Sequence, residues 1–245
     1  MIDNFVRIID EVYSTITKPI DSMFKEIAIN KGKQQLNIGL EENFGNVYSK
    51  LIKDSKEKGI VYTPEEISEY IIKNTILNSD IIENPFLKIS DPACGSGNVL
   101  IPCFKYLKKI YIENIDAINI KNDLNLMIKD LDKHIIDNNL YGFDIDVVAT
   151  KVLLIDLFKE SNYINEDNFY NIDFLMTQIK GRFDVIIGNP PYIGHKSVDR
   201  EYSIQLKAKY KEIYKDKGDI SYCFFQAALE ILEDKGKLGF ITSRY

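Results

Sequence analysis

Residues 182–192, RFDVIIGNPPY, contain the clearest strand of the sequence and end it abruptly. Val185, Ile186 and Ile187 are contiguous, without the polar residues that alternate along a strand with one solvated face. Such a run is typical of a parallel strand that helices cover on both faces. The residues after it, Asn189-Pro190-Pro191-Tyr192, are therefore predicted to lie at the carboxyl end of a buried strand.

Further strands alternate with helices on both sides of this stretch. Strand patterns occupy residues 86–90, 139–144, 168–174 and 236–243, and helical patterns occupy 97–112, 147–160 and 220–233. Asp219 is expected to cap the last of these helices, and residues 113–139 to form a polar helical insertion. Because alternating strands and helices form right-handed βαβ units, the sequence predicts an α/β fold with a doubly wound, Rossmann-like sheet.

The first 57 residues are predicted to form a helical extension, and residues 58–245 a single α/β domain. Apolar residues recur at helical spacing in 6–16 and 44–58, whereas 31–43 is expected to be a loop. In the helix expected over 62–76, Thr63 is the expected N-cap and Pro64 the first helical residue.

Composition excludes several classes of protein. Apolar residues make up 45% of the 245 residues, which is enough for a core, but no apolar run is long enough to span a membrane. Three cysteines fit no metal-ligand spacing and cannot all pair, which favours a reducing cytosol, and only two histidines are present. The net charge of −6 does not indicate a nucleic-acid binder, although residues 195–217 are locally basic.

A glycine-rich turn, Asp91-Pro92-Ala93-Cys94-Gly95-Ser96-Gly97, follows the first strand. Gly95 and Gly97 allow a tight turn and the close approach of a ligand. A dinucleotide fingerprint needs a third glycine, where this sequence has Leu100. Asp91 would repel a pyrophosphate but accept hydrogen bonds from an ammonium group, so the turn favours a zwitterionic nucleoside. Cys94 has no basic neighbour to activate it and is expected to pack in the core.

Acidic residues follow the second and third strands. An acid at the end of the second strand commonly holds a ribose diol, and in Gly142-Phe143-Asp144-Ile145-Asp146 we assign that role to Asp144, with Asp146 as the alternative. Asp173 and Phe174 could bind adenine, the carboxylate accepting its amino group and the ring packing on the base. A helix cap beside a core aromatic would explain this second pair nearly as well.

The NPPY stretch has the chemistry of an amine clamp. Pro190 has a fixed φ, and Pro191 biases it toward an extended conformation, so the backbone carbonyls need not fold back into a turn. The Asn189 carbonyl and a backbone carbonyl offer two acceptors beside the flat face of Tyr192. Accepting both N–H groups of a planar amine from one side localises its lone pair for attack, and no strong base is required.

Together these stretches resemble the adenine-N6 DNA methyltransferases of restriction–modification systems, in the type I and fused type II group. The resemblance covers residues 45–245 and rests on YTP at 62–64, DPACGSG at 91–97, GFDID at 142–146 and NPPY at 189–192, in that order. It implies S-adenosylmethionine as cofactor, no metal, a prokaryotic cytoplasmic location, and double-stranded DNA with a flipped adenine as substrate. A specificity or nuclease subunit or domain is the further partner that it implies.

The family roles are carried over residue by residue. Tyr62, Thr63 and Pro64 would surround the methionine end of the cofactor, and Asp91 would face its amino group. The remaining cofactor residues would be Ala93, Gly95, Gly97, Asp144, Ile145, Asp173 and Phe174. Asn189, Pro190, Pro191 and Tyr192 would form the catalytic clamp, and the basic segment after it would cover the DNA strand.

The sequence departs from the family at its end, because it stops just past the fifth strand at Tyr245. The family sheet is normally completed by an antiparallel pair of strands and followed by a target-recognition domain. We therefore expect an amino-terminal part of a longer protein, with its last strands missing, that methylates DNA weakly or not at all alone.

Several alternatives stay open on the sequence. A methyltransferase acting on protein glutamine or on an RNA guanine amine would use a similar clamp, and cytosine-N4 is a less favoured target. A non-catalytic subunit could bind the cofactor only to stabilise a restriction complex. A cytosine-C5 enzyme is rejected, because it needs a cysteine nucleophile beside the target base and the fourth strand ends without one.

Overall fold

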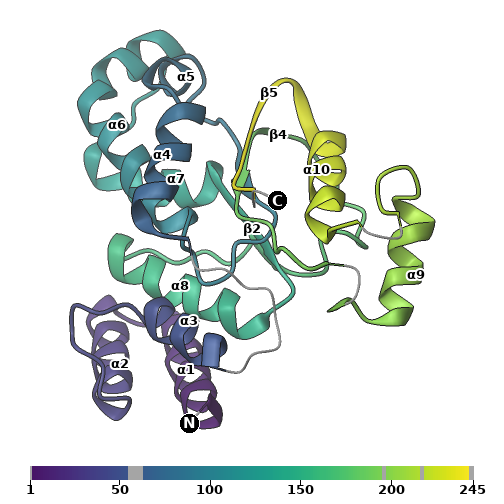
Figure 1. Ribbon diagram of the computed structural model, residues 1–245. Coiled ribbons are helices and arrows are strands. Elements are labelled where there is room, and N and C mark those ends of the chain that lie inside the picture. Colours follow the sequence, from purple (N-terminus) through teal and green to yellow (C-terminus); the bar gives the residue numbers. More distant parts are fainter. Residues whose placement is uncertain (1, 55–62, 195–196, 216–217, 243–245) are drawn as a thin grey trace.

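The structure is a computed structural model that describes residues 2–54, 63–194, 197–215 and 218–242. Its described strands form one parallel sheet in the order β3-β2-β1-β4-β5 (Figure 1). The strands are β1 (Ile89–Asp91), β2 (Leu140–Asp144), β3 (Phe169–Asn171), β4 (Phe183–Gly188) and β5 (Leu232–Phe240). The predicted doubly wound α/β sheet is confirmed.

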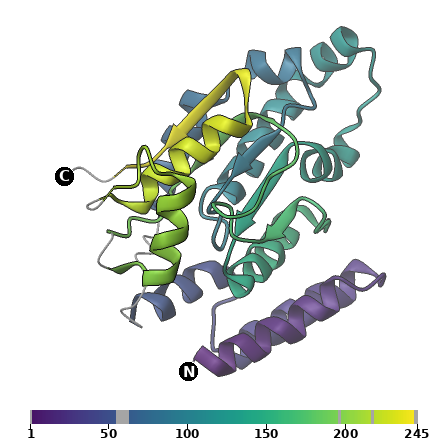
Figure 2. The same cartoon turned by 90° about the vertical axis from the view of Figure 1, so that its right-hand side faces the viewer.

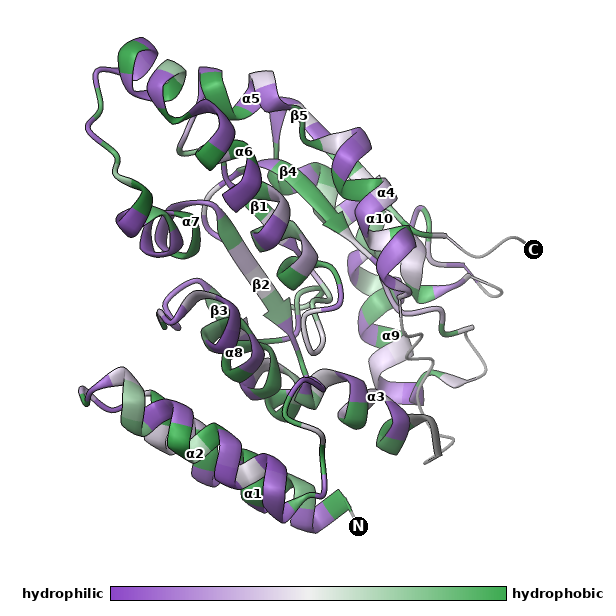
Figure 3. Ribbon diagram, turned by 90° about the vertical axis from the view of Figure 1, so that its left-hand side faces the viewer, coloured by the Kyte–Doolittle hydropathy of each residue, from purple (hydrophilic) through white to green (hydrophobic). Residues whose placement is uncertain are grey.

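Helices cover both faces of the sheet. Their bounds are α1 (Ile2–Ile16), α2 (Ser22–Gln35), α3 (Phe44–Asp54), α4 (Glu65–Thr75), α5 (Asn78–Glu83), α6 (Leu100–Asn122), α7 (Leu131–Asn138), α8 (Val147–Ser161), α9 (Arg200–Lys209) and α10 (Ile220–Ile231), with a 3₁₀ turn at Ile128–Asp130. Val185 and Ile187 pack in the core with α4, α6 and α8, whereas Ile186 packs on the opposite side with α10. The strand of the opening stretch is therefore buried on both faces, and Figure 3 shows it as a largely apolar strand between helices.

The amino-terminal helices form a third layer. Phe5, Ile9 and Val12 of α1 share a core with Val152 and Ile155 of α8. The helices α1 and α2 lie side by side on the outer side of α8, away from the sheet (Figures 1 and 2). The helices predicted in this region are present, and we keep the division at residue 57 as a proposal.

Three boundary predictions were wrong. Residues 31–35 belong to α2 and not to a loop, because Gly32 lets α2 pack closely on α1: a Cβ there would lie 2.7 Å from Val12 Cγ2. The insertion expected at 113–139 contains helices as predicted, but it does not begin at residue 113, because α6 continues to Asn122. Helix α4 begins at Glu65, with Pro64 at the N-cap position, so Thr63 does not cap it.

Asp219 caps α10 as predicted, accepting the Ser221 N–H at 2.9 Å. In the part of the chain that the structure describes, no helix is both long and apolar enough to cross a membrane.

Candidate active site

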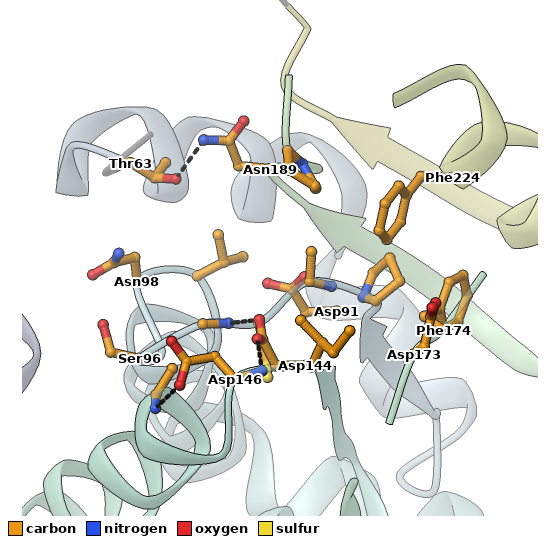
Figure 4. A pocket seen from close by; sticks show the side chains of 18 of the residues that line it. Thr63, Asp91, Ser96, Asn98, Asp144, Asp146, Asp173, Phe174, Asn189 and Phe224 are labelled. Atoms are coloured by element: carbon orange, nitrogen blue, oxygen red, sulfur yellow. Dashed lines mark hydrogen bonds between the residues drawn. The ribbon is translucent and has the colours of Figure 1, made fainter. Parts of the chain in front are cut away.

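A cavity of about 320 Å³ lies at the carboxyl ends of β1, β2, β3 and β4. This is the edge at which open α/β sheets bind their ligands. It is lined by Asp91 and the glycine turn, by the acidic loops after β2 and β3, by Asn189 and Pro191, and by side chains from α3, α9 and α10. Figure 4 shows Thr63 and Asn189 on one side of the cavity, with Asp144 and Asp146 on the other.

The glycine turn has the backbone geometry that only glycine adopts readily. Gly95 has φ 51° and Gly97 has φ 94°. Gly97 itself is covered by the core, since a Cβ there would lie 2.5 Å from Leu153 Cδ1. Cys94 is buried, and burial raises the pKa of its thiol, which agrees with a packing role and leaves it a poor nucleophile.

Asp91 is a buried acid at the floor of the cavity, only 1% exposed. Its Oδ1 accepts the Ala93 N–H at 3.0 Å. Burial raises the pKa of the Asp91 carboxyl to about 8, and the nearby Asp144 carboxylate adds to the shift. A cation bound beside Asp91 would favour the ionised form, so the site is suited to an ammonium group.

Gly188, the last residue of β4, makes room for this carboxyl. A Cβ at Gly188 would lie 2.5 Å from Asp91 Oδ1 and 3.1 Å from its Cγ. No real Cβ approaches an oxygen so closely, so the carboxyl would have to move. The glycine in front of Asn189 is therefore needed for the cavity floor, a role that its sequence context does not reveal.

Asp144 links the second strand to the glycine turn. Its Oδ2 accepts the Gly95 N–H at 2.8 Å, and its Oδ1 accepts the Asp146 N–H at 2.8 Å. Burial raises the pKa of Asp144, while these backbone hydrogen bonds lower it. Asp146 is engaged elsewhere, because its Oδ1 caps α8 through the N–H groups of Val148 and Ala149. Both acids line the cavity, and Asp144 stays our proposed residue for a ribose diol, with Asp146 as the alternative.

Asp173 and Phe174 line the cavity and also serve the fold. Asp173 Oδ1 accepts the N–H groups of Leu175 at 2.9 Å and Met176 at 3.1 Å. Phe174 is buried and stacks on Phe224 at 5.9 Å between ring centroids. Burial raises the pKa of Tyr202 of α9, and the nearby Asp173 carboxylate adds to the shift. The position of this pair is thus compatible with adenine binding and also with a backbone cap beside a core aromatic ring.

Asn189 lies where β4 ends, and its amide is oriented by two neighbours. Its Nδ2 donates to Thr63 Oγ1 at 3.0 Å. The single proton of the Tyr192 hydroxyl is directed to two acceptors, the Ile241 carbonyl oxygen at 2.5 Å and Asn189 Oδ1 at 2.8 Å. The amide nitrogen therefore faces Thr63, and the amide oxygen faces the Tyr192 hydroxyl.

The structure brings most of the predicted site residues to this cavity, but not all. Those that line it are Thr63, Asp91, Ala93, Gly95, Asp144, Ile145, Asp173, Phe174, Asn189 and Pro191. Pro64 is exposed, Gly97 and Pro190 are buried, and Tyr192 reaches the site through its hydroxyl contact with Asn189. Tyr62 lies outside the described residues.

Several lining residues were missed by sequence reasoning. Tyr48, Ser49 and Ile52 come from α3, in the segment predicted as an extension, and Tyr202 and Phe224 come from α9 and α10. The helical spacing of α3 indicates one apolar face but gives no sign that this face meets a ligand site. Ser96 and Asn98 also line the cavity, and their place in and beside the glycine turn could have identified them.

Comparisons with known proteins agree with this geometry. A family model described as "Eco57I restriction-modification methylase" matches residues 107–245, more than half of the chain. The type II restriction enzyme and methyltransferase RM.Eco57I of Escherichia coli is 24% identical, over 95% of this chain and 30% of that protein. The type II methyltransferase M.VspI of Vibrio sp. (strain 343) is 28% identical, over 98% of this chain and 53% of that protein.

The chain thus spans 30% of the length of RM.Eco57I and 53% of the length of M.VspI. Among solved structures, the ATP-dependent type ISP restriction-modification enzyme LlaBIII bound to DNA matches with a TM-score of 0.59 at 16% identity. That match covers 98% of this chain and 21% of the LlaBIII chain, and it shows a shared fold.

Proposed function

The chain belongs to the Eco57I restriction-modification methylase family, and we propose that it methylates the N6 amine of adenine in DNA with S-adenosylmethionine, within a restriction–modification system. The observation that carries the proposal is the position of Asn189. Its amide lines the same cavity as Asp91, the glycine turn and Asp144. An amine acceptor and a nucleoside-type pocket thus share one site.

The cavity supports S-adenosylmethionine as the cofactor. Its volume of about 320 Å³ lies within the roughly 300–1,000 Å³ of small-molecule sites. Asp91 would hold the ammonium group, Asp144 the ribose diol, and Asp173 with Phe174 the adenine. When bound there, the cofactor supplies an electrophilic methyl group on a sulfonium.

The residues after β4 would act on the target amine. Asn189 Oδ1 and the Pro190 carbonyl would accept its two N–H groups from one side, which localises the nitrogen lone pair. The contact of the amide nitrogen with Thr63 Oγ1 at 3.0 Å supports the use of the amide oxygen as this acceptor. Tyr192 would stack on the base. Its hydrogen bond to Asn189 Oδ1 would have to break, or Oδ1 would have to accept a second hydrogen bond from the target amine.

Duplex DNA would deliver the adenine by flipping it out of the stack, since its amine is otherwise paired. Exposed basic residues of α9 and the turn after it, Arg200, Lys207, Lys209, Lys211 and Lys215, are our candidates for contacts to the strand. DNA binding by further domains or by a specificity subunit is part of the proposal, because the relatives are longer than this chain.

Cofactor binding is tested by calorimetry with S-adenosylmethionine on the wild type and on Asp144→Ala. We expect binding by the wild type and a loss of about 10- to 100-fold in the variant, the size expected for hydrogen bonds to a charged group. Methyl transfer is tested with labelled cofactor and protein in excess over DNA, RNA or protein substrates, so that slow turnover is detected. Label recovered as N6-methyladenine is expected; label in RNA, in protein or in N4-methylcytosine would overturn the assignment.

A further inference from the structure

Helix α3 forms one wall of the cavity, although α4, α5 and β1 separate it from the glycine turn in the sequence and it packs in the amino-terminal layer. Tyr48, Ser49 and Ile52 line the cavity together with Asp144. The start of α3 also packs directly on the glycine turn: a Cβ at Gly45 would lie 3.2 Å from both the backbone oxygen and the Oγ of Ser96. The amino-terminal layer therefore reaches the ligand site itself.

A buried carboxylate fixes the position of α3. Asp156 of α8 is 1% exposed. Its Oδ1 accepts the Phe44 N–H at 3.1 Å and its Oδ2 accepts the Gly45 N–H at 2.8 Å. These are two of the N–H groups that have no partner within a helix, and the positive end of the helix dipole favours the negative charge there. Asp156 thus ties the first turn of α3 to the middle of α8.

This arrangement places Tyr48 at the acidic loop after β2, where it lines the cavity together with Asp144 and Asp146. Its hydroxyl donates to Asp146 Oδ2 at 2.7 Å, and its ring stacks on Phe5 at 5.5 Å between centroids. The pKa of Tyr48 is raised by burial first, then by Asp146 and by Asp144. Because its single proton is directed to Asp146, the hydroxyl oxygen presents only lone pairs to a ligand next to Asp144.

A ribose diol offers two O–H donors. The cavity offers two acceptors for them, the Asp144 carboxylate and the Tyr48 hydroxyl oxygen. We propose that Tyr48 is a cofactor-binding residue that accepts a hydrogen bond from the ribose alongside Asp144, and that Asp156 is a positioning residue that holds α3 in place for it. This proposal rests on the proposed function, because it takes an adenosyl cofactor as the ligand.

The first experiment measures S-adenosylhomocysteine binding by calorimetry. Failure of the wild type to bind would count against the proposed function and not specifically against Tyr48. With a binding wild type, Tyr48→Phe is expected to weaken affinity about 5- to 10-fold, the loss of one hydrogen bond. Tyr163→Phe is the matched control, because the Tyr163 hydroxyl also donates to a carboxylate, that of Asp137 at 2.9 Å, outside the cavity. Equal affinities of Tyr48→Phe and wild type would overturn the proposal.

An analogue without the ribose hydroxyls separates a direct contact from a structural effect. The 2′,3′-dideoxy form of S-adenosylhomocysteine should bind wild type and Tyr48→Phe with the same affinity, because the proposed hydrogen bond is absent in both. If Tyr48→Phe weakens both ligands equally, the hydroxyl acts on the fold and not on the ribose, and the proposed contact is wrong.

The role of Asp156 is tested by a double-mutant cycle with Tyr48. Asp156→Asn is expected to weaken S-adenosylhomocysteine binding, and the double variant Asp156→Asn/Tyr48→Phe to bind no more weakly than the weaker single variant, since both remove the same contact. Hydrogen exchange of residues 44–54 should slow on ligand addition in the wild type and not in Asp156→Asn. Additive losses in the cycle would overturn the positioning role, and thermal unfolding of each variant confirms that the measurements are made on folded protein.

Discussion

The amide of Asn189 donates its Nδ2–H to the hydroxyl oxygen of Thr63 at 3.0 Å, across 126 positions of sequence. An asparagine amide can occupy either of two orientations that exchange its oxygen and nitrogen. In the observed orientation the nitrogen contacts the Thr63 hydroxyl and the oxygen faces the Tyr192 hydroxyl. Thr63 thus contacts Asn189 and also lines the cavity.

Thr63→Val, which keeps the side-chain shape but removes the hydroxyl, should lower the rate of methyl transfer about 5- to 10-fold, the effect of one hydrogen bond. Thr63→Ser retains the hydroxyl and should restore most of that rate. The measurement is single-turnover methyl transfer to DNA, with cofactor affinity determined in parallel. Equal rates for the valine and serine variants would show that the hydroxyl does not orient Asn189.

Gly188→Ala should disrupt the cavity floor, because its Cβ would meet Asp91 Oδ1 at 2.5 Å. We expect a loss of more than about 10-fold in S-adenosylmethionine affinity, since displacing a buried carboxyl removes a charged hydrogen-bonding partner. Calorimetry provides the measurement. Gly39→Ala is the control, because nothing lies within 4 Å of a Cβ at Gly39, and its affinity should match the wild type. A wild-type affinity in Gly188→Ala would mean that Asp91 can relax or is not needed.

The raised pKa of Asp91 predicts a pH dependence of stability. In the unfolded chain this carboxyl ionises near pH 4, whereas burial keeps it protonated in the folded protein up to about pH 8. The folded state therefore holds the extra proton in this window, so the free energy of unfolding should fall as pH rises from about 4 to 8 and level off above. Asp156, whose pKa is raised to about 6 by burial, contributes in the same direction.

Comparing the wild type with Asp91→Asn isolates the contribution of Asp91 to the pH dependence of stability, because Asp156 is present in both proteins. The neutral asparagine variant should lose less thermal stability between pH 5 and pH 8 than the wild type. Saturating S-adenosylmethionine should reduce the difference, since its ammonium group favours the ionised carboxyl. Parallel curves for the two proteins without ligand would contradict a buried, protonated Asp91.

The sheet and the centre of the site could be predicted from the sequence because their signals are local. The contiguous apolar run at 185–187 indicates a doubly covered strand, and the glycine turn and the acids follow directly on their strands. Parallel strands bring their carboxyl ends to one edge, so residues at these ends come together without any long-range information. Asp91, Asp144 and Asn189 were found in this way, and all three line the cavity.

The missed features depend on contacts between distant parts of the chain. Nothing near Gly188 in the sequence indicates that Asp91 needs its space. Tyr48 lies on an ordinary amphipathic helix, and only the packing of α3 on α8 turns it toward the cavity. The loop predicted from residue 31 and the boundary predicted at residue 113 were wrong, because tertiary packing continues α2 to Gln35 and α6 to Asn122 through polar sequence.

Asn189→Ala should separate chemistry from cofactor binding. The variant loses the acceptor that we propose for the target amine but keeps Asp91, Asp144 and the glycine turn. We expect S-adenosylmethionine affinity within about twofold of the wild type and methyl transfer reduced by about 100-fold or more, as for loss of a preorganised transition-state partner. Asn165→Ala, which removes a side-chain hydrogen bond to Asp137 outside the cavity, is the control for loss of an asparagine amide. A variant that still transfers methyl groups at the wild-type rate would exclude Asn189 from the reaction.

The ring and the hydroxyl of Tyr192 are expected to affect the rate of methyl transfer differently. Tyr192→Phe keeps the stacking face and removes the hydroxyl that occupies Asn189 Oδ1 at 2.8 Å. We therefore expect methyl transfer close to the wild-type rate, because the target amine no longer competes with that hydroxyl. Tyr192→Ala removes the ring, and kcat/KM should fall by roughly 10- to 100-fold, since stacking of a base on an aromatic side chain contributes about 1–3 kcal/mol. Steady-state methylation of DNA by both variants provides the measurement. A larger loss in Tyr192→Phe than in Tyr192→Ala would assign the importance of this residue to its hydroxyl and contradict a stacking role.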